Sequence, residues 1–310
     1  MVPISAQKTV RLTDLSIFER GNSDHAGAIF NSYPHRSLVR CQYQQYPVDT
    51  DWFNLLLIIL AALLAHISVN MLNEYSDYKS GLDLNTERTP FSGGSGALPA
   101  HPQSANAVLW GGVLSLGLMG LIGLYFMQQA GWLVLPYGLC GATIIVSYTH
   151  YINRMPWLCL IAPGIGFGLL MVSGTQLVLQ NQITPAGIYA SAIVFFLVNN
   201  LLLLNQFPDI KADQAAGRYH AVIAWGTEKA AALYGVFVFA ATATLAFALW
   251  QGIFPLVSAV ALLPLILGFI AWSGAKSLQQ DIGQQPKYLA MNVMMNMLTP
   301  TLLALSLFFS

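Results

Sequence analysis

Apolar residues occur in eight long runs separated by shorter polar segments. Each run approaches the roughly 20 residues that an α-helix needs to cross a bilayer. The predicted spans are about 53–72, 105–128, 131–149, 157–178, 185–207, 230–250, 252–273 and 290–309. The pattern predicts an all-α fold, a polytopic transmembrane helical bundle.

The N-terminal segment differs from the rest of the chain. Residues 1–52 are polar and mixed and contain no comparable apolar run. They also lack the central apolar region of a cleavable signal sequence. We therefore expect a polar N-terminal segment over 1–52 and a membrane domain over 53–310.

The basic residues after position 52 are distributed asymmetrically. All of them lie in loops after the first, third, fifth and seventh runs: Lys79, Arg88, Arg154, Lys211, Arg218, Lys229, Lys276 and Lys287. Loops of a membrane protein that are rich in Lys and Arg stay in the cytoplasm. We expect a multi-pass protein of the inner (cytoplasmic) membrane with this side facing the cytoplasm.

Composition narrows the class further. The chain is 55% hydrophobic and 8% charged with zero net charge, whereas a soluble domain has about 25% charged residues. A neutral chain lacks the basic surface that nucleic-acid binding requires, so we expect no nucleic-acid partner. Charged residues gathered at the end of a membrane helix are costly, and they indicate a functional site.

Two such polar clusters follow the first and fifth runs. In the first, Asn73 and Asp77 are four residues apart, and in the second Asn205 and Asp209 repeat that spacing. Residues four apart share a helix face, so we expect Asp213 to continue the face of the second cluster, with Pro208 kinking or restarting the helix within it. The repeated pattern predicts two repeats of about four helices around a central cavity.

The chemistry of these clusters indicates a metal and a phosphate-bearing ligand. They hold the aspartates Asp77, Asp83, Asp209 and Asp213 and the basic residues Lys79, Arg88, Lys211 and Arg218. Converging carboxylates repel one another, and Mg²⁺ relieves the repulsion while binding water and phosphate oxygens. Nearby cations suit phosphate. A diphosphate head with a long apolar tail fits both the site and the membrane.

At these motifs the chain resembles the UbiA superfamily of intramembrane prenyltransferases. The stretch from Asn73 to Asp83 is similar to the first motif of its MenA-type form, with Glu74 where Asp is usual. The stretch from Asn205 to Gly217 is similar to the second motif. The resemblance covers about 53–310 and implies a bundle, usually of nine spans. No counterpart of the family's first helix is visible before the first run, so 1–52 is expected to be atypical or to lack that helix.

The resemblance also assigns roles to individual residues. The metal-binding positions that it implies are Asn73, Asp77, Asp83, Asp209 and Asp213. Lys79 and Arg88 match diphosphate contacts, and the candidate substrate-binding set also includes Lys211, Arg218 and Asn205. The candidate catalytic residues are Asp77, Asp209 and Tyr148, the last resembling a family tyrosine near the reacting allylic carbon.

The implied activity is Mg²⁺-dependent transfer of a polyprenyl group from polyprenyl diphosphate to an aromatic quinone precursor. By similarity the acceptor is 1,4-dihydroxy-2-naphthoate, in menaquinone synthesis, and the lipid bilayer is the third partner. Other acceptors such as 4-hydroxybenzoate, an inactive family member and a secondary transporter stay open. Transporter sites lie near the bilayer midplane, whereas both clusters here follow the ends of runs, which favours the enzyme.

Overall fold

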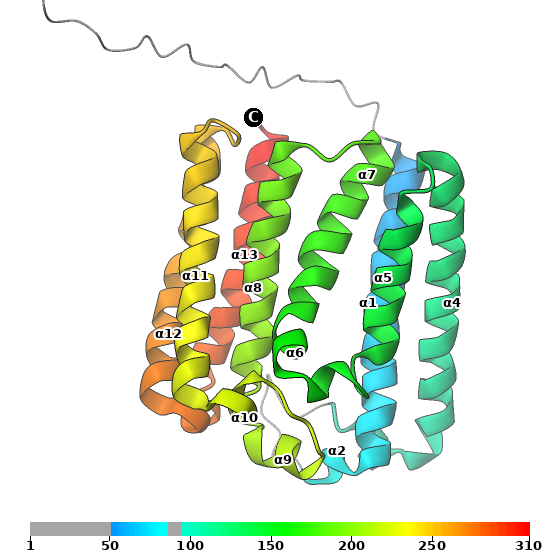
Figure 1. The fold of residues 1–310 in the computed structure, drawn as a ribbon, viewed down its shortest axis with the longest axis vertical. Helices are drawn as coiled ribbons and strands as arrows, with labels where there is room; N and C mark the ends of the chain where they lie inside the picture. The colour runs from blue at the N-terminus through cyan, green and yellow to red at the C-terminus, as the bar shows by residue number, and fades with distance from the viewer. Residues whose placement is uncertain (1–50, 86–94) are drawn as a thin grey trace, which may run out of the picture. The chain divides into compact units, whose positions relative to one another are not determined.

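Antiparallel helices run between the two ends of the bundle (Figure 1). The computed structural model describes residues 51–85 and 95–310. Every regular element within those two ranges is a helix. The predicted all-α fold is therefore confirmed. The predicted N-terminal segment lies outside the described residues, apart from Asp51 and Trp52. The two-repeat organisation stays a prediction.

Seven helical stretches among the described residues are long and apolar enough to cross a membrane. They are Trp52–Ser80, Pro102–Ala130, Pro156–Gln180, Pro185–Asn205, Thr227–Trp250, Leu256–Gln284 and Lys287–Phe308. The remaining predicted run, 131–149, forms the shorter helix α5 (Val134–Ser147). It is short because Gly131, at a φ of 89°, ends the preceding helix and a turn follows Ser147.

Five stretches consist of, or are dominated by, one continuous helix: α1 (Trp52–Ser80), α4 (Ala105–Ala130, preceded by η1, Pro102–Ser104), α8 (Pro185–Asn205), α11 (Thr227–Trp250) and α13 (Lys287–Phe308). Two are composite: α6 (Pro156–Gly164), η3 (Ile165–Ser173) and α7 (Gly174–Gln180), then η4 (Leu256–Leu262), α12 (Leu265–Leu278) and η5 (Gln279–Gln284). The short elements are α2 (Leu82–Asn85), α3 (Ala97–Ala100), η2 (Ile152–Arg154), α9 (Ile210–Ala215) and α10 (Ala221–Trp225).

The break between α6 and η3 has a local cause. Pro163 lies inside α6 and cannot donate a backbone hydrogen bond. The next residue, Gly164, donates its N–H to Asn199 Oδ1 of α8 at 2.6 Å, outside its own helix. The helix then continues with π-helical geometry in η3. Absence of a side chain at Gly164 and Gly168 lets this stretch lie directly against the α8 backbone.

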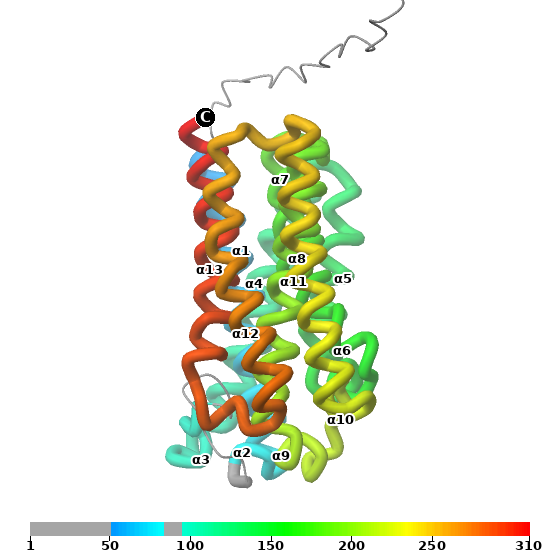
Figure 2. Tube along the Cα trace, turned by 90° about the vertical axis from the view of Figure 1, so that its left-hand side faces the viewer, coloured from blue at the N-terminus to red at the C-terminus, as the bar shows by residue number. Residues whose placement is uncertain are grey.

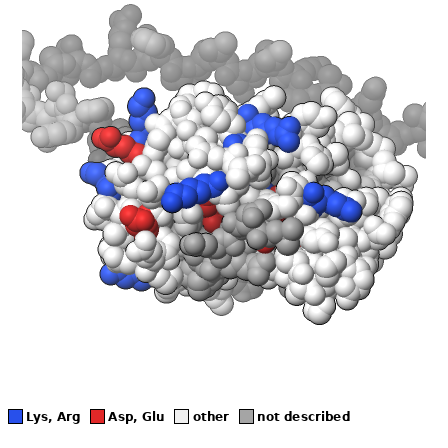
Figure 3. All heavy atoms as spheres, turned by 90° about the horizontal axis from the view of Figure 1, so that it is seen from below, with Lys and Arg blue, Asp and Glu red and all other residues white. Residues whose placement is uncertain are grey.

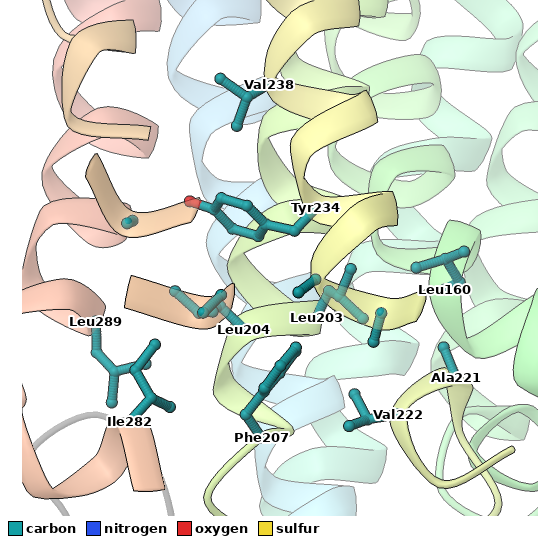
Figure 4. Close-up of a cluster of buried hydrophobic side chains, with 14 residues drawn as sticks. Leu160, Leu203, Leu204, Phe207, Ala221, Val222, Tyr234, Val238, Ile282 and Leu289 are labelled. Carbon is teal, nitrogen blue, oxygen red and sulfur yellow. The ribbon is translucent and has the colours of Figure 1, made fainter. Parts of the chain in front are cut away.

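The two sides of the bundle are packed differently. Helices α8, α10, α11, α12 and α13 surround a continuous core, in which Phe207 and Tyr234 are fully buried (Figure 4). Helix α1, by contrast, buries only Ser68 and Asp77. It packs mainly against α4, where Ser68 Oγ donates to the Gly112 carbonyl at 2.9 Å. Most of the remaining surface of α1 is apolar, as a lipid-facing helix requires.

The short elements α2, α3, α9 and α10 gather at one end of the bundle (Figure 2). Lys and Arg side chains are spread over this face, with acidic atoms between them (Figure 3). The chain's own C-terminus lies at the opposite end (Figure 1). The basic residues that the structure describes in these loops therefore lie on one face of the bundle, as the sequence predicts (Figure 3).

Candidate active site

The two predicted motifs meet at this end through a single guanidinium. Arg218 Nη2 lies 2.5 Å from Asp77 Oδ1, and Arg218 Nη1 lies 2.9 Å from Asp213 Oδ1. Asp77 is near the C-terminal end of α1, whereas Asp213 is on α9. The two carboxylates are only 10% and 5% exposed, so the attraction is weakly screened by water. The structure thus brings an aspartate of each motif to one cation.

The charge state of Arg218 follows from these contacts. Burial alone would lower the pKa of the guanidinium, because it disfavours the charged form. The carboxylates of Asp213 and Asp77 outweigh burial, and the pKa of Arg218 is raised above its ordinary value. Arg218 therefore carries a fixed positive charge between the motifs.

Asp77 is held from its other side by its own helix. Asn73 Nδ2 donates to Asp77 Oδ2 at 2.7 Å, which is the i, i+4 contact that the sequence predicts. Asn73 Oδ1 accepts from Thr149 Oγ1 at 3.0 Å, just after α5. Asn73 therefore connects Asp77 to the neighbouring helix, and its amide oxygen lies beside the carboxylate.

Asp213 has an equivalent partner that sequence reasoning missed. His220 Nε2 lies 3.0 Å from Asp213 Oδ2, and the imidazole is 2% exposed. The only sequence signal is proximity, since His220 follows Asp213 by seven positions and Gly217 lies between them. A glycine at that place indicates a reversal of the chain, but the contact itself requires the turn geometry.

That reversal is a Schellman turn at the end of α9. Gly217 has a φ of 76°, which glycine adopts without steric cost. Its N–H donates to the Gln214 carbonyl at 3.1 Å, and the Arg218 N–H donates to the Asp213 carbonyl at 2.9 Å. The turn places Arg218 directly over the residue that its side chain binds.

The second motif does not form the single helix face that its spacing predicts. Helix α8 ends at Asn205, residues 206–209 form a turn, and α9 begins at Ile210. Pro208 lacks an N–H and cannot continue the helix. Asn205, Asp209 and Asp213 therefore lie on successive elements. Asn205 Oδ1 is buried without a hydrogen-bond partner in the described part of the chain.

The other two predicted metal-binding aspartates lie on the elements that adjoin this pair, α2 and the turn before α9. Asp83 is buried in α2, immediately after Gly81 ends α1, and α2 packs against α9. Asp209 is the residue before α9 and is half-buried. All four predicted aspartates therefore lie at one end of the bundle (Figure 2).

The remaining predicted basic residues lie at the surface or beyond the described ranges. Lys79 is exposed, with Nζ 5.6 Å from the centre of the Tyr75 ring. Lys211 is exposed on α9. Arg88 lies outside the described residues. Arg218 is thus the predicted substrate-binding cation that the structure places between the motifs.

Tyr148 ends α5 at the same end of the bundle. It packs against a small cluster that includes Ile152 and Cys159. Cys159 Sγ also accepts from Gln206 Nε2 at 3.4 Å, which links this cluster to the turn after α8. Tyr148 also directly precedes Thr149, which is hydrogen-bonded to Asn73, so its ring is at the same end of the bundle as the carboxylate pair.

The donor chemistry of the site suits Mg²⁺. Among the described residues no group of three or more His, Cys, Asp or Glu is arranged to hold a metal. Asp77 and Asp213 nevertheless offer carboxylate oxygens around a position that already attracts a cation. Mg²⁺ sites commonly use one or two carboxylates and complete the shell with water and substrate phosphate. The residues present fit that pattern.

Comparison with known proteins identifies the class. The UbiA prenyltransferase family matches residues 43–308. The chain belongs to the UbiA prenyltransferase family, and its apolar helices make it a multi-pass membrane protein.

Two curated relatives are similar to the chain, and both are named 1,4-dihydroxy-2-naphthoate octaprenyltransferase. The one from Bacillus subtilis (strain 168) is 29% identical over 189 residues, covering 60% of this chain and 59% of the relative. The one from Escherichia coli (strain K12) is 25% identical over 208 residues, covering 59% of this chain and 65% of the relative. The chain therefore spans about three-fifths of the length of these relatives. No solved structure matches it significantly.

Proposed function

We propose that this protein transfers a polyprenyl group from polyprenyl diphosphate to an aromatic quinone precursor, with Mg²⁺, at the cytoplasmic face of the inner membrane. The main support is the bridge from Arg218 to Asp77 and Asp213, which joins the two motifs of the family at one point. The proposed acceptor is 1,4-dihydroxy-2-naphthoate, the compound in the names of both relatives.

The proposed metal site uses the aspartates of both motifs. Asp77 and Asp213 are the primary ligands, with Asp83 and Asp209 adjacent and Asn73 supporting Asp77. Bound Mg²⁺ supplies positive charge that stabilises the departing diphosphate. The chain's own contribution is to hold these oxygens at the end of the bundle, where a polar head group reaches them while its tail stays among apolar helices.

Arg218 is proposed to stabilise the negative charge of the departing diphosphate as well. A guanidinium binds phosphate through two parallel N–H donors, and its strength rises where water is excluded. On substrate binding, Arg218 is proposed to donate to diphosphate oxygens in place of one or both aspartates. The exposed Lys79 and Lys211 attract the diphosphate to this face, as we expect of Arg88.

The reaction itself breaks two bonds and forms one. The allylic carbon–oxygen bond breaks, and diphosphate leaves with the electron pair. The ring carbon that bears the carboxylate then forms a carbon–carbon bond to the allylic cation, and the carboxylate leaves as carbon dioxide, so that the electron pair of the broken bond restores the aromatic ring. Tyr148 is proposed to stabilise the cation through its π-face. The surrounding apolar side chains keep water from capturing it.

A product assay tests the proposal. Membranes containing the full chain receive Mg²⁺, a polyprenyl diphosphate, and either 1,4-dihydroxy-2-naphthoate or 4-hydroxybenzoate. We expect prenylated, decarboxylated product from the naphthoate, and none with chelator or with Asp77→Ala or Asp209→Ala. Ser306→Ala serves as a control, because Ser306 is hydrogen-bonded to Ser258 at the other end of the bundle. Product from 4-hydroxybenzoate alone would overturn the acceptor, and no product with either would overturn the enzyme proposal.

A further inference from the structure

The imidazole of His220 contacts the carboxylate oxygen of Asp213 that Arg218 does not contact. Its Nε2 contacts Asp213 Oδ2 at 3.0 Å, while Arg218 contacts Oδ1 of the same carboxylate at 2.9 Å. An ionised carboxylate only accepts hydrogen bonds, so Nε2 is the donor. His220 thus occupies one oxygen of Asp213 and leaves the other directed at the site.

The backbone around His220 is fixed by its neighbours. The Tyr219 N–H donates to the Asn153 carbonyl at 2.8 Å, which ties the segment after Gly217 to η2. His220 is extended and directly precedes α10, whose Ala221 and Val222 are buried in the large core with Phe207 (Figure 4). A backbone held on both sides presents the imidazole at a defined position.

The first motif shows the same arrangement with a different side chain. Asn73 Nδ2 donates to Asp77 Oδ2 at 2.7 Å, and Asp77 Oδ1 faces Arg218. Each aspartate therefore has its Oδ2 held by an amide or imidazole donor and its Oδ1 directed at the common cation. Partners of this kind orient carboxylates that bind metals, and their loss typically weakens metal affinity about 10- to 100-fold.

We propose that His220 is a positioning residue that holds Asp213 by Oδ2 so that Oδ1 faces the point shared with Asp77. This inference rests on the proposed Mg²⁺ site. It adds a residue outside the motif that begins at Asn205 and ends at Gly217, and it gives the second motif the counterpart of Asn73 in the first.

The test compares three substitutions at one position in the full chain, purified in detergent. His220→Gln keeps an N–H donor at the reach of Nε2, His220→Asn places its amide closer to the backbone, and His220→Leu has no donor. The first readout is the Mg²⁺ concentration that gives half of the metal-induced rise in melting temperature. The second is the Mg²⁺ concentration for half-maximal prenyl transfer.

We expect His220→Leu and His220→Asn to raise both Mg²⁺ midpoints about tenfold, and His220→Gln to stay near the wild-type values. The control Ser306→Ala removes a buried hydrogen bond far from the site. It should lower the melting temperature and leave both midpoints unchanged. If His220→Leu does not fold, the Gln and Asn variants still give the comparison.

The outcomes separate the inference from the proposed function. Equal Mg²⁺ midpoints in the Gln, Asn and wild-type proteins would overturn the positioning role and leave His220 as a packing residue. If the wild-type protein shows no metal-induced rise in melting temperature, the Mg²⁺ site itself fails, and the inference fails with it. A prenylated product formed without Mg²⁺ would also overturn both the metal site and the role of His220 in it.

Discussion

The two halves of the site are built in different ways. The first half is an unbroken helix: Asn73 and Asp77 are one turn apart on α1, and their contact needs nothing beyond helical geometry. The second half is a helix that stops at Asn205 and resumes at Ile210. The break allows the chain to turn back, so that Arg218 and His220 both reach Asp213. On the continuous helix α1, Asp77 is contacted by a residue of the same helix face. After the break in the second half, Asp213 is contacted by residues that follow a turn.

The largest expected effect tests whether the halves act as one site. Asp77→Ala and Asp213→Ala should each lower kcat for prenyl transfer by at least about 100-fold, because each removes a primary carboxylate ligand of the proposed Mg²⁺, and the metal in turn holds the diphosphate. The double variant should be little worse than either single variant, since residues that act as a unit are not additive. Steady-state product formation measures this. If the fold-losses in kcat of the two single variants multiply in the double variant, the two halves act as independent sites.

Removing the cation between the halves should come next in size. Arg218→Gln leaves two buried carboxylates facing each other, and without Mg²⁺ it should lower the free energy of unfolding by about 3 kcal/mol. Mg²⁺ should then stabilise the variant more than the wild-type protein, since the metal replaces the missing charge. Thermal melting with Mg²⁺ and with chelator measures both. Arg218→Lys is the control: it keeps a positive charge at this position, but an ammonium does not bind both carboxylates as a guanidinium does. A Mg²⁺ response equal to that of the wild-type protein would show that Arg218 and metal do not share the position.

The turn of the second half can be tested without touching a polar group. A Cβ at Gly217 would meet no atom within 4 Å, but its φ of 76° disfavours any other residue. Gly217→Ala should lower the free energy of unfolding by about 1–2 kcal/mol and weaken activity through Asp213. Gly120→Ala in α4 is a matched control, because a Cβ there also meets open space on a helical backbone. It should be neutral or stabilising by up to about 1 kcal/mol. If Gly217→Ala and Gly120→Ala change the melting temperature equally, the turn at Gly217 does not contribute to stability as proposed.

The smallest expected effect concerns the surface lysines. Lys79→Gln and Lys211→Gln should each raise KM for polyprenyl diphosphate by less than about fivefold, because interactions of exposed charges are worth at most about 1 kcal/mol. The effect should shrink further as salt is added. Initial rates at two ionic strengths measure it. A loss comparable to that of Arg218→Gln would mean that substrate binding buries these lysines.

Much of this arrangement can be predicted from the sequence because it depends on periodicity. Apolar runs predict the helices, and the four-residue spacing of Asn73 and Asp77 predicts their contact. The same rule does not hold across Asn205, Asp209 and Asp213, because Pro208, at which the sequence also predicts a kink or restart, interrupts the helix. The role of His220 depends on the reversal at Gly217, and a turn of that kind is set by tertiary packing as well as by the glycine. Arg218 is predicted as a phosphate-binding cation from its charge, but its bridge between segments 141 positions apart is visible only in three dimensions.

The sparse packing of α1 has a consequence for how this protein is handled. Asp77 is carried by a helix whose apolar side chains, Leu56, Leu60 and Leu63 among them, are exposed rather than packed in a core. Its height relative to α9 is therefore set in part by hydrophobic matching with the surrounding lipid. We therefore expect a change in bilayer thickness to act on α1 more than on the α8–α13 core, whose side chains are buried. We expect the rate of the proposed prenyl transfer to vary with the acyl-chain length of the surrounding lipid.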